Sequence, residues 1–250
     1  MEGTDEYRAL RAAVHPMAQL LRQHAATPGI ELEFRLGRID AGTGRWTSDM
    51  GFTVHDTFLA RCAAPPAHHA PAALRFGPWS EHVDFAYALD DGRAVRTRVT
   101  YDASTCTVAR ASVRKRRVET IEAAIEGTPF AVRLDASIEE PVEDASLPEA
   151  AEPTRVAISQ RCSAAYGRRG SGAPLWRYDA TMQWAGASHS AAEHLQRSSS
   201  TAPAYMMELE FTGKVDDPEA YGAERLVVSG LLKVMDIVGA GDATLALRGR

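Results

Sequence analysis

Apolar and polar residues alternate along most of the chain, with the period of two that half-buried β-strands require. Turn signals such as Asp90-Asp91-Gly92 and Gly127-Thr128-Pro129 separate several of these segments. The strands predicted in this way are Ile30–Ile39, His82–Leu89, Ala94–Tyr101, Cys106–Ser112, Val113–Ile125, Phe130–Ile138, Arg155–Ala165, Leu175–Trp184 and Met206–Phe211. Many short strands with such turns favour a β-barrel or a β-sandwich.

Helical spacing replaces the strand period at both ends of the chain. Asp5–His24 has an apolar stripe, although Pro16 favours a kink or two shorter helices. A closing helix is predicted over residues 217–238, with Asp217 as its N-cap and Gly239 as its stop. Loops are predicted at Ala63–Pro78, Glu139–Pro153 and Gly186–Pro203, the last with a short helix around Ala191–Gln196. We therefore expect a helical segment at residues 1–29 and one strand-rich domain at 30–250 that includes the closing helix.

The composition narrows the class of protein. Hydrophobic content of 45% and charged content of 24% are those of a globular protein, and no apolar run is long enough to cross a membrane. Cys62, Cys106 and Cys162 are isolated, which argues against a disulfide framework or zinc site and favours a reducing compartment, cytoplasmic or nuclear. The net charge of −5 argues against broad binding of nucleic acid, but clustered basic residues still allow binding of one phosphate-rich end.

The polar faces of the predicted strands are unusually charged. In Ile30–Ile39, apolar residues alternate with Glu31, Glu33 and Arg35. In Met206–Phe211, they alternate with Glu208 and Glu210. Further sets that share one face are Arg96 with Arg98, Arg133 with Asp135, Ser137 and Glu139, and Arg177 with Asp179 and Thr181. A single such strand is most simply a solvent face. Carboxylates gathered on two strands and cations on others indicate instead a closed barrel with a charged interior.

Such an interior suits a phosphate-rich ligand and a divalent cation together. A 5′-triphosphate carries about four negative charges, which several Arg and Lys side chains could neutralise, Arg bidentately. Mg²⁺ and Mn²⁺ prefer hard oxygen ligands, commonly carboxylates, phosphate oxygens and water. Buried charges are tolerated only when they are paired or metal-bound.

Three segments carry a family resemblance: Ile30–Gly37 with its Glu-x-Glu-x-Arg pattern, Trp176–Thr181 with Arg-x-Asp-x-Thr, and Met206–Phe211 with Glu-x-Glu. In this order they resemble the triphosphate tunnel metalloenzymes, and among them the RNA 5′-triphosphatases of fungal and large-DNA-virus mRNA capping, the capping-enzyme β-subunit type. The resemblance extends over Ile30 to Phe211. It implies a mainly β fold of the α+β kind: a closed antiparallel β-barrel tunnel with flanking N- and C-terminal helices.

The resemblance also implies roles for individual residues. The metal, Mg²⁺ or Mn²⁺, would be held by Glu31, Glu33, Glu208 and Glu210. Phosphate would be bound by Arg35, Arg96, Arg98, Lys115, Arg117, Arg133 and Arg161. Catalysis would involve Glu139, Arg177, Asp179 and Thr181, with water attacking the γ-phosphorus in line and no covalent enzyme intermediate.

The sequence departs from the family pattern at two positions. Met206 stands where the capping branch often has the first of three alternating glutamates, and Ser159 stands where a basic residue is common. Two alternatives therefore stay open. One is a tunnel hydrolase of small triphosphates, such as inorganic, nucleoside or thiamine triphosphate, and the other is a barrel that binds phosphorylated ends without catalysis.

The expected partner is a 5′-triphosphate RNA end. No lysine-nucleophile capping motif is present, so guanylyl transfer would fall to a guanylyltransferase on another chain or to a region absent from this sequence. We expect no membrane association, and a monomer and a homodimer are equally compatible with the sequence. A viral origin is also compatible with it.

Overall fold

The structure is a computed structural model, and it describes residues 5–24, 27–40, 42–63, 75–88, 94–102, 106–143, 152–167, 174–212, 222–239 and 245–247. The helices are α1 (Asp5–His24), α2 (Phe52–Ala63), α3 (His189–Arg197) and α5 (Ala223–Ile237). The strands are β1 (Ile30–Ile39), β2 (Trp46–Thr47), β3 (Ser80–Ala88), β4 (Ala94–Asp102), β5 (Thr107–Ile125), β6 (Phe130–Pro141), β7 (Arg155–Gly167), β8 (Pro174–Gly186), β9 (Ala204–Phe211) and β10 (Leu245–Leu247). Among the described residues, no helix is both long and apolar enough to cross a membrane.

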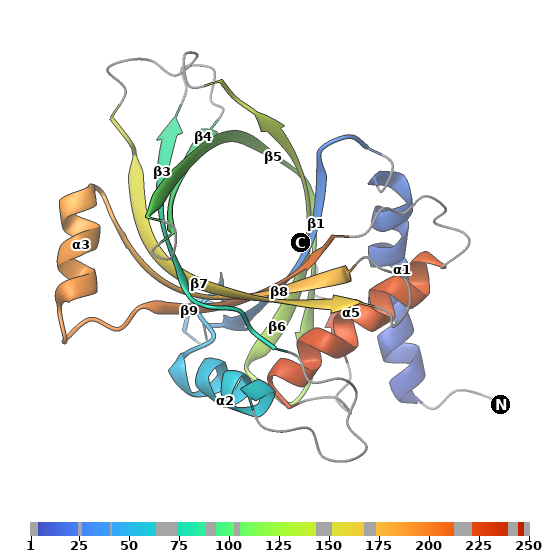
Figure 1. Cartoon of the computed structure of the whole chain (residues 1–250). Coiled ribbons are helices and arrows are strands. Elements are labelled where there is room, and N and C mark those ends of the chain that lie inside the picture. The colour runs from blue at the N-terminus through green and yellow to red at the C-terminus, as the bar shows by residue number, and fades with distance from the viewer. Residues whose placement is uncertain are drawn as a thin grey trace.

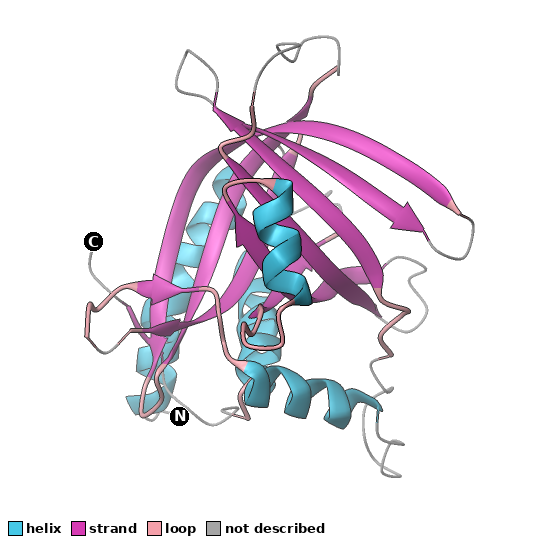
Figure 2. Ribbon diagram, turned by 90° about the vertical axis from the view of Figure 1, so that its left-hand side faces the viewer, coloured by secondary structure: helices cyan, strands magenta, loops and turns pink. Residues whose placement is uncertain are grey.

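Eight strands close into an antiparallel barrel. The order β5-β4-β3-β7-β8-β9-β1 is completed by β6, which pairs with both β1 and β5. Figure 1 looks along the barrel axis and Figure 2 shows the same strands from the side. The short strands β2 and β10 are added outside this ring, on β1 and β5. Each of the eight strands therefore pairs with a neighbour on both sides. In this way a closed barrel avoids edge-to-edge association.

The hydrophobic core lies outside the barrel wall, beneath the helices. The outward residues Leu32, Phe34 and Leu36 of β1 are at most 4% exposed. They belong to one cluster with Met17 and Leu20 of α1 and with residues of α5, and both helices cover that side of the barrel in Figure 1. Burial of this apolar face fixes the register of each strand, and with it which residues point inward.

A glycine lets α5 approach this wall closely. A Cβ atom built on Gly230 would lie 2.4 Å from Cε2 of Phe34, whose side chain is 1% exposed. Only a residue without a side chain fits at this contact. The helix therefore packs directly on the outward side chain of Phe34, on the strand that carries the charged residues on its other face.

The predicted fold class, a closed antiparallel barrel with flanking helices, is confirmed. The two strands predicted at Cys106–Ser112 and Val113–Ile125 form the single strand β5, and α1 continues through Pro16 without a break. The short helix expected around Ala191–Gln196 is α3. The sequence prediction missed α2, β2 and β10. The predicted start of the closing helix at Asp217 lies outside the described residues, whereas the described helix begins at Ala223.

Candidate active site

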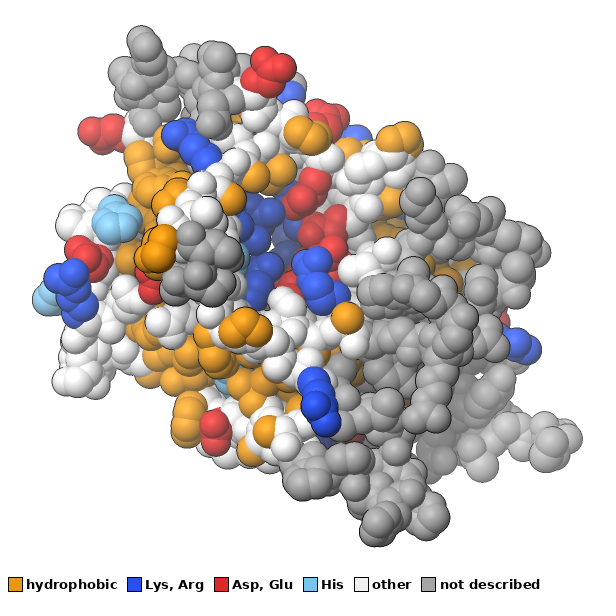
Figure 3. Space-filling model, viewed as in Figure 1, with side chains coloured by type: hydrophobic (Ala, Val, Ile, Leu, Met, Phe, Trp, Pro, Cys, Tyr) orange, Lys and Arg blue, Asp and Glu red, His pale blue; other side chains and the backbone are white. Residues whose placement is uncertain are grey.

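The strand register gathers charged residues from different strands inside the barrel. Glu33 of β1 lies opposite Asp135 of β6 and opposite Glu210 of β9, and Glu210 in turn lies opposite Arg177 of β8. Residues that face each other in antiparallel strands project from the same side of the sheet. Figure 3 shows the result, a central hollow lined by Lys and Arg side chains together with Asp and Glu side chains.

The glutamates predicted to bind metal come from the neighbouring strands β1 and β9. Arg35 lies between two of them: its Nη2 donates to Oε2 of Glu33 at 2.6 Å, and its Nε is 3.3 Å from Oε1 of Glu208. Burial, followed by the nearby charge of Glu208, raises the pKa of Glu33 well above its ordinary value, although Arg35 acts in the opposite direction. Carboxylates on β1 and β9 are thus close enough to repel one another.

Glu31 lies in a second cluster that joins β1, β4, β5 and β6. The ammonium group of Lys115 donates to Oε2 of Glu31 and lies 3.4 Å from Oε1 of Glu139. Nη2 of Arg96 donates to the same Glu139 oxygen at 3.1 Å. Burial alone would raise the pKa of Glu31, but the charge and hydrogen bond of Lys115, with the Ser137 hydrogen bond and the charge of Arg96, outweigh it and lower the pKa. This cluster therefore holds a metal-candidate carboxylate ionised beside two cations.

Asp179 organises the cations of β7 and β8. Its carboxylate accepts from Nε of Arg177 at 3.1 Å, from Nη1 of Arg161 at 3.4 Å and from Oγ of Ser163 at 2.5 Å. Arg177 also donates to Glu210. The Asp179 side chain is 3% exposed, so its charge is compensated by these groups rather than by water.

Thr181 lies next along β8 and is 1% exposed. Its hydroxyl has no hydrogen-bond partner among the described residues. The residue opposite it on β9 is Met206. A buried hydroxyl without a partner is costly, so a ligand or water that reaches it would be favoured.

Arg98 is already engaged within the protein. Its Nε and Nη2 donate to the two carboxylate oxygens of Asp84 at 2.7 and 2.8 Å, a bidentate pair between β3 and β4. Asp84 therefore competes with phosphate for this guanidinium group. Burial alone would raise the pKa of Asp84, but the hydrogen bond and charge of Arg98, with the charges of Arg96 and Arg161, outweigh it and lower the pKa.

His82 is an interior residue that the sequence reasoning did not single out. Its two ring nitrogens lie 2.9 Å from Oγ of Ser80 and 2.9 Å from Oγ1 of Thr100. Burial, then the positive charges of Arg98 and Arg161, lowers the pKa of His82 to about 4. Strand alternation could have identified it, since Ser80 and His82 share a face with the interior carboxylate of Asp84.

Arg117 and Arg133 lie toward another part of the interior. The Arg117 side chain is 61% exposed and its Nε is 3.8 Å from Asp135. Arg133 donates to Oε2 of Glu122 at 2.7 Å, and its guanidinium carbon lies 4.0 Å from the ring centroid of Trp46. Arg133 is therefore paired and stacked, and it does not join the cluster around Glu139.

Ser159, one of the two departures from the family pattern, is buried and accepts a 3.2 Å hydrogen bond from Nε2 of Gln183. It lies opposite His82 on β3. A polar but uncharged pair thus occupies this place. The cation of β7 nearest to Ser159 in the sequence is Arg161, two residues further along the strand.

No group of three or more Asp, Glu, His or Cys side chains is arranged to hold a metal ion within the described part of the chain. Each glutamate on β1 and β9 is held by Arg or Lys instead. The donor set nevertheless fits a hard divalent cation, because it offers carboxylate oxygens only. The raised pKa of Glu33 beside Glu208 has the same implication, since a cation would relieve that repulsion.

No protein-family model matches the sequence, and no curated protein matches it either. Solved structures do match it. The Pct1 RNA triphosphatase of S. pombe has a TM-score of 0.63 and 20% identity, over 90% of this chain and 91% of that chain. Its complex with the Spt5 CTD gives a TM-score of 0.61 at 20% identity, over the same 90% and 91%. The Mimivirus capping enzyme triphosphatase gives 0.55 at 13% identity, over 90% and 96%.

At these identities the likeness concerns the fold. The predicted resemblance to the tunnel RNA triphosphatases is confirmed at that level, and it covers almost the whole of both chains. The chain thus has the closed-tunnel fold of the capping RNA triphosphatases that it resembles.

Proposed function

We propose that the protein is a metal-dependent RNA 5′-triphosphatase that removes the γ-phosphate from triphosphate-ended mRNA and leaves a 5′-diphosphate end. One observation carries this proposal: the closed barrel turns Glu33 and Glu210 inward from adjoining strands, directly beside Arg35 and Arg177. A site where both signs of charge meet in this way can bind an anionic ligand and a cation together. The fold shared with RNA triphosphatases supports the same reaction class.

Glu31, Glu33, Glu208 and Glu210 would hold the Mg²⁺ or Mn²⁺ ion. When bound, such an ion offsets negative charge on phosphoryl oxygens and helps to orient them. Arg35 would hold Glu33 and Glu208 in place, because it already contacts both carboxylates. Lys115 performs the same task for Glu31.

The phosphate chain would be bound by cations that now pair with carboxylates. Arg96 and Lys115 share Glu139, while Arg161 and Arg177 share Asp179. A polyphosphate that enters between these groups can take over some of the hydrogen bonds, and each remaining carboxylate keeps its cation aligned. Arg35, Arg98, Arg117 and Arg133 would add positive potential, although Arg98 and Arg133 stay bound to Asp84 and Glu122.

Glu139 is the group that we assign to the attacking water. Its Oε1 faces Arg96 and Lys115, so a water molecule that donates to its carboxylate would lie next to the bound phosphate. Arg177, aligned by Asp179, would stabilise charge on the transferring group, and the free hydroxyl of Thr181 would donate to a phosphate oxygen. The 5′-diphosphate product is the substrate of guanylyl transfer, which a guanylyltransferase would perform.

The test is release of γ-phosphate from triphosphate-ended RNA, with Mg²⁺, with Mn²⁺ and with chelator. ATP and inorganic triphosphate run in parallel. The variants are Glu33→Gln and Glu210→Gln, and the control is Glu193→Gln, which changes a glutamate on α3 that pairs only with Arg197 in the described structure. Each interior variant should lose about 10²-fold or more in rate if its carboxylate acts in the transition state.

Metal-dependent release from RNA that both interior variants lose, and that Glu193→Gln keeps, would establish the reaction. Release from small triphosphates alone would assign the protein to the small-triphosphate hydrolases instead. A folded protein that releases phosphate from no substrate would be a phosphate-end-binding barrel. Met206 favours this last outcome, because it supplies no carboxylate opposite Thr181.

A further inference from the structure

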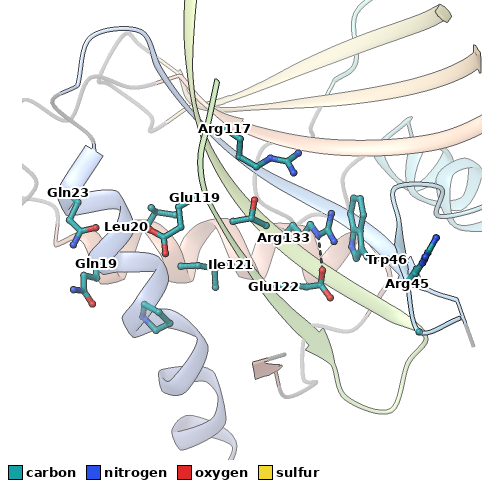
Figure 4. A pocket seen from close by; sticks show the side chains of 13 residues that line it. Gln19, Leu20, Gln23, Arg45, Trp46, Arg117, Glu119, Ile121, Glu122 and Arg133 are labelled. Atoms are coloured by element: carbon teal, nitrogen blue, oxygen red, sulfur yellow. Dashed lines mark hydrogen bonds and ion pairs between the residues drawn. The ribbon is translucent and has the colours of Figure 1, made fainter. Parts of the chain in front are cut away.

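A cavity of about 1270 Å³ lies between α1, the loop before β2 and the strands β5 and β6. Figure 4 shows Gln19 and Gln23 of α1 on one side of it and Trp46, Arg133 and Glu122 on the other. This volume exceeds the roughly 300–1,000 Å³ of ordinary small-molecule pockets. The cavity therefore has room for a nucleotide.

The cavity continues into the barrel interior. Glu122 lies opposite Arg133 on β6, and Arg133 lies opposite Arg35 on β1, which contacts Glu33. Arg117 lines the cavity and also reaches to 3.8 Å from the interior carboxylate of Asp135. Arg117 and Arg133 thus belong both to the cavity and to the charged interior, so a ligand held at the acidic centre can extend past Arg117 toward the cavity.

A rigid stack forms one side of this cavity. The ring of Trp46 rests on Gly37, where a Cβ atom would lie 2.3 Å from Cε2 of the indole, so this position tolerates only glycine. The guanidinium group of Arg133 covers the ring at 4.0 Å and is fixed by its 2.7 Å bond to Glu122. Because its charge is paired, Arg133 is poorly suited to clamp phosphate. A planar guanidinium group stacked in this way is instead well suited to receive a nucleobase.

We infer that this cavity binds the first nucleotide of the RNA, with its base stacked on the Arg133–Trp46 pair and its phosphates passing Arg117 toward the acidic centre. The inference rests on the proposed function, because it places the nucleoside end of the same substrate. Trp46 would then contribute to the binding of RNA and not to that of inorganic triphosphate, which has no base. Stacking on a planar group tolerates any base, as recognition of varied transcript ends requires.

The experiment compares the parent protein with Trp46→Leu on triphosphate-ended RNA and on inorganic triphosphate. The matched control is Trp79→Leu, a half-exposed tryptophan that does not line the cavity. We expect Trp46→Leu to raise KM for RNA about tenfold, equivalent to about 1.4 kcal/mol, with kcat and the hydrolysis of inorganic triphosphate unchanged. Equal effects on both substrates, or no effect on either, would overturn the inference.

A second readout does not need catalysis. A short triphosphate-ended RNA with 2-aminopurine as its first base should lose fluorescence on binding to the parent protein, because stacking quenches this base. Arg133→Gln should weaken the quenching and the affinity, and it serves as the deciding variant if Trp46→Leu fails to fold. If the parent hydrolyses no triphosphate, the proposed function fails while this binding measurement still decides the subsite. RNA that binds without quenching would exclude it.

Discussion

Arg35 and Glu33 form a charged pair on the interior face of β1, with Nη2 of the arginine 2.6 Å from Oε2 of the glutamate. Both come from one strand, two residues apart, and point the same way because side chains alternate across a strand. The Glu33 side chain is 6% exposed and Arg35 23%, so water contributes little to their compensation. Arg35 therefore offsets part of the repulsion between Glu33 and the neighbouring carboxylates Glu208 and Glu31.

Arg35→Met should destabilise the fold strongly, because it leaves Glu33 buried with carboxylate neighbours and no cation bound to it. Loss of one partner of a buried ion pair costs about 3–5 kcal/mol. Urea unfolding measures the free energy of unfolding of the variant and the parent. The control is Arg197→Met, which breaks an exposed pair with Glu193 and should cost less than about 0.5 kcal/mol. Adding Glu33→Gln to Arg35→Met should recover part of the loss, and a double variant that is no more stable than Arg35→Met would contradict this account.

Asp179→Asn should reduce kcat/KM for triphosphate-ended RNA by about 10²-fold. The amide removes the charge that aligns Arg177 and Arg161 and keeps nearly the same shape. Steady-state kinetics measure the effect. The control is Asp236→Asn, which changes an exposed aspartate on α5. Undiminished activity in a folded Asp179→Asn protein would show that neither arginine needs its carboxylate to act.

The charged interior could be predicted from sequence because one rule decides it. Alternation in Ile30–Ile39 and Met206–Phe211 sets Leu32 and Leu209 on one face and Glu33 and Glu210 on the other, whichever strands they pair with. His82 obeys the same rule, but its strand lacks the Glu-x-Glu pair that indicates a metal site on β1 and β9.

Contacts between distant segments could not be predicted in this way. β2 has two residues, too few for any periodicity, so nothing in the sequence indicated that Trp46 would cover Gly37 and Arg133. The partners of Arg133 and Arg98 also depend on strand order, which alternation does not determine. The sequence therefore predicted cations facing inward, whereas the structure distinguishes those that pair with Glu122 and Asp84 from those around Glu139 and Asp179.

Gly230→Ala should destabilise the protein although alanine is the better helix former. The added methyl group would lie 2.4 Å from the buried ring of Phe34, and so close a contact belongs at the upper end of the about 1–3 kcal/mol that overpacking costs, which outweighs a gain of about 1 kcal/mol in helix propensity. Thermal and urea unfolding measure the difference. Ser229→Ala, at the adjacent half-buried position of α5, loses the hydrogen bond that its hydroxyl accepts from Nζ of Lys233 at 3.0 Å, and it should stay within about 1 kcal/mol of the parent. A Gly230→Ala protein as stable as Ser229→Ala would mean that α5 can move away from β1.

His82 should stay neutral at any pH above about 5, because its pKa in the folded protein is about 4, lowered first by burial and then by Arg98 and Arg161. Asp84 and Asp179 oppose this shift without overcoming it. The unfolded chain would protonate this histidine near its ordinary pKa of 6.5, so the folded state loses stability as pH falls from about 6.5 toward 4 and gains nothing from His82 above that range. Replacing His82 with Gln, which can still bond Ser80 and Thr100, should remove this component, so the variant should lose less stability than the parent between pH 7 and pH 5. Urea unfolding at the two pH values measures the difference, and an NMR titration of the ring gives the pKa directly. A His82 resonance that titrates near 6.5 would mean that solvent reaches this part of the tunnel.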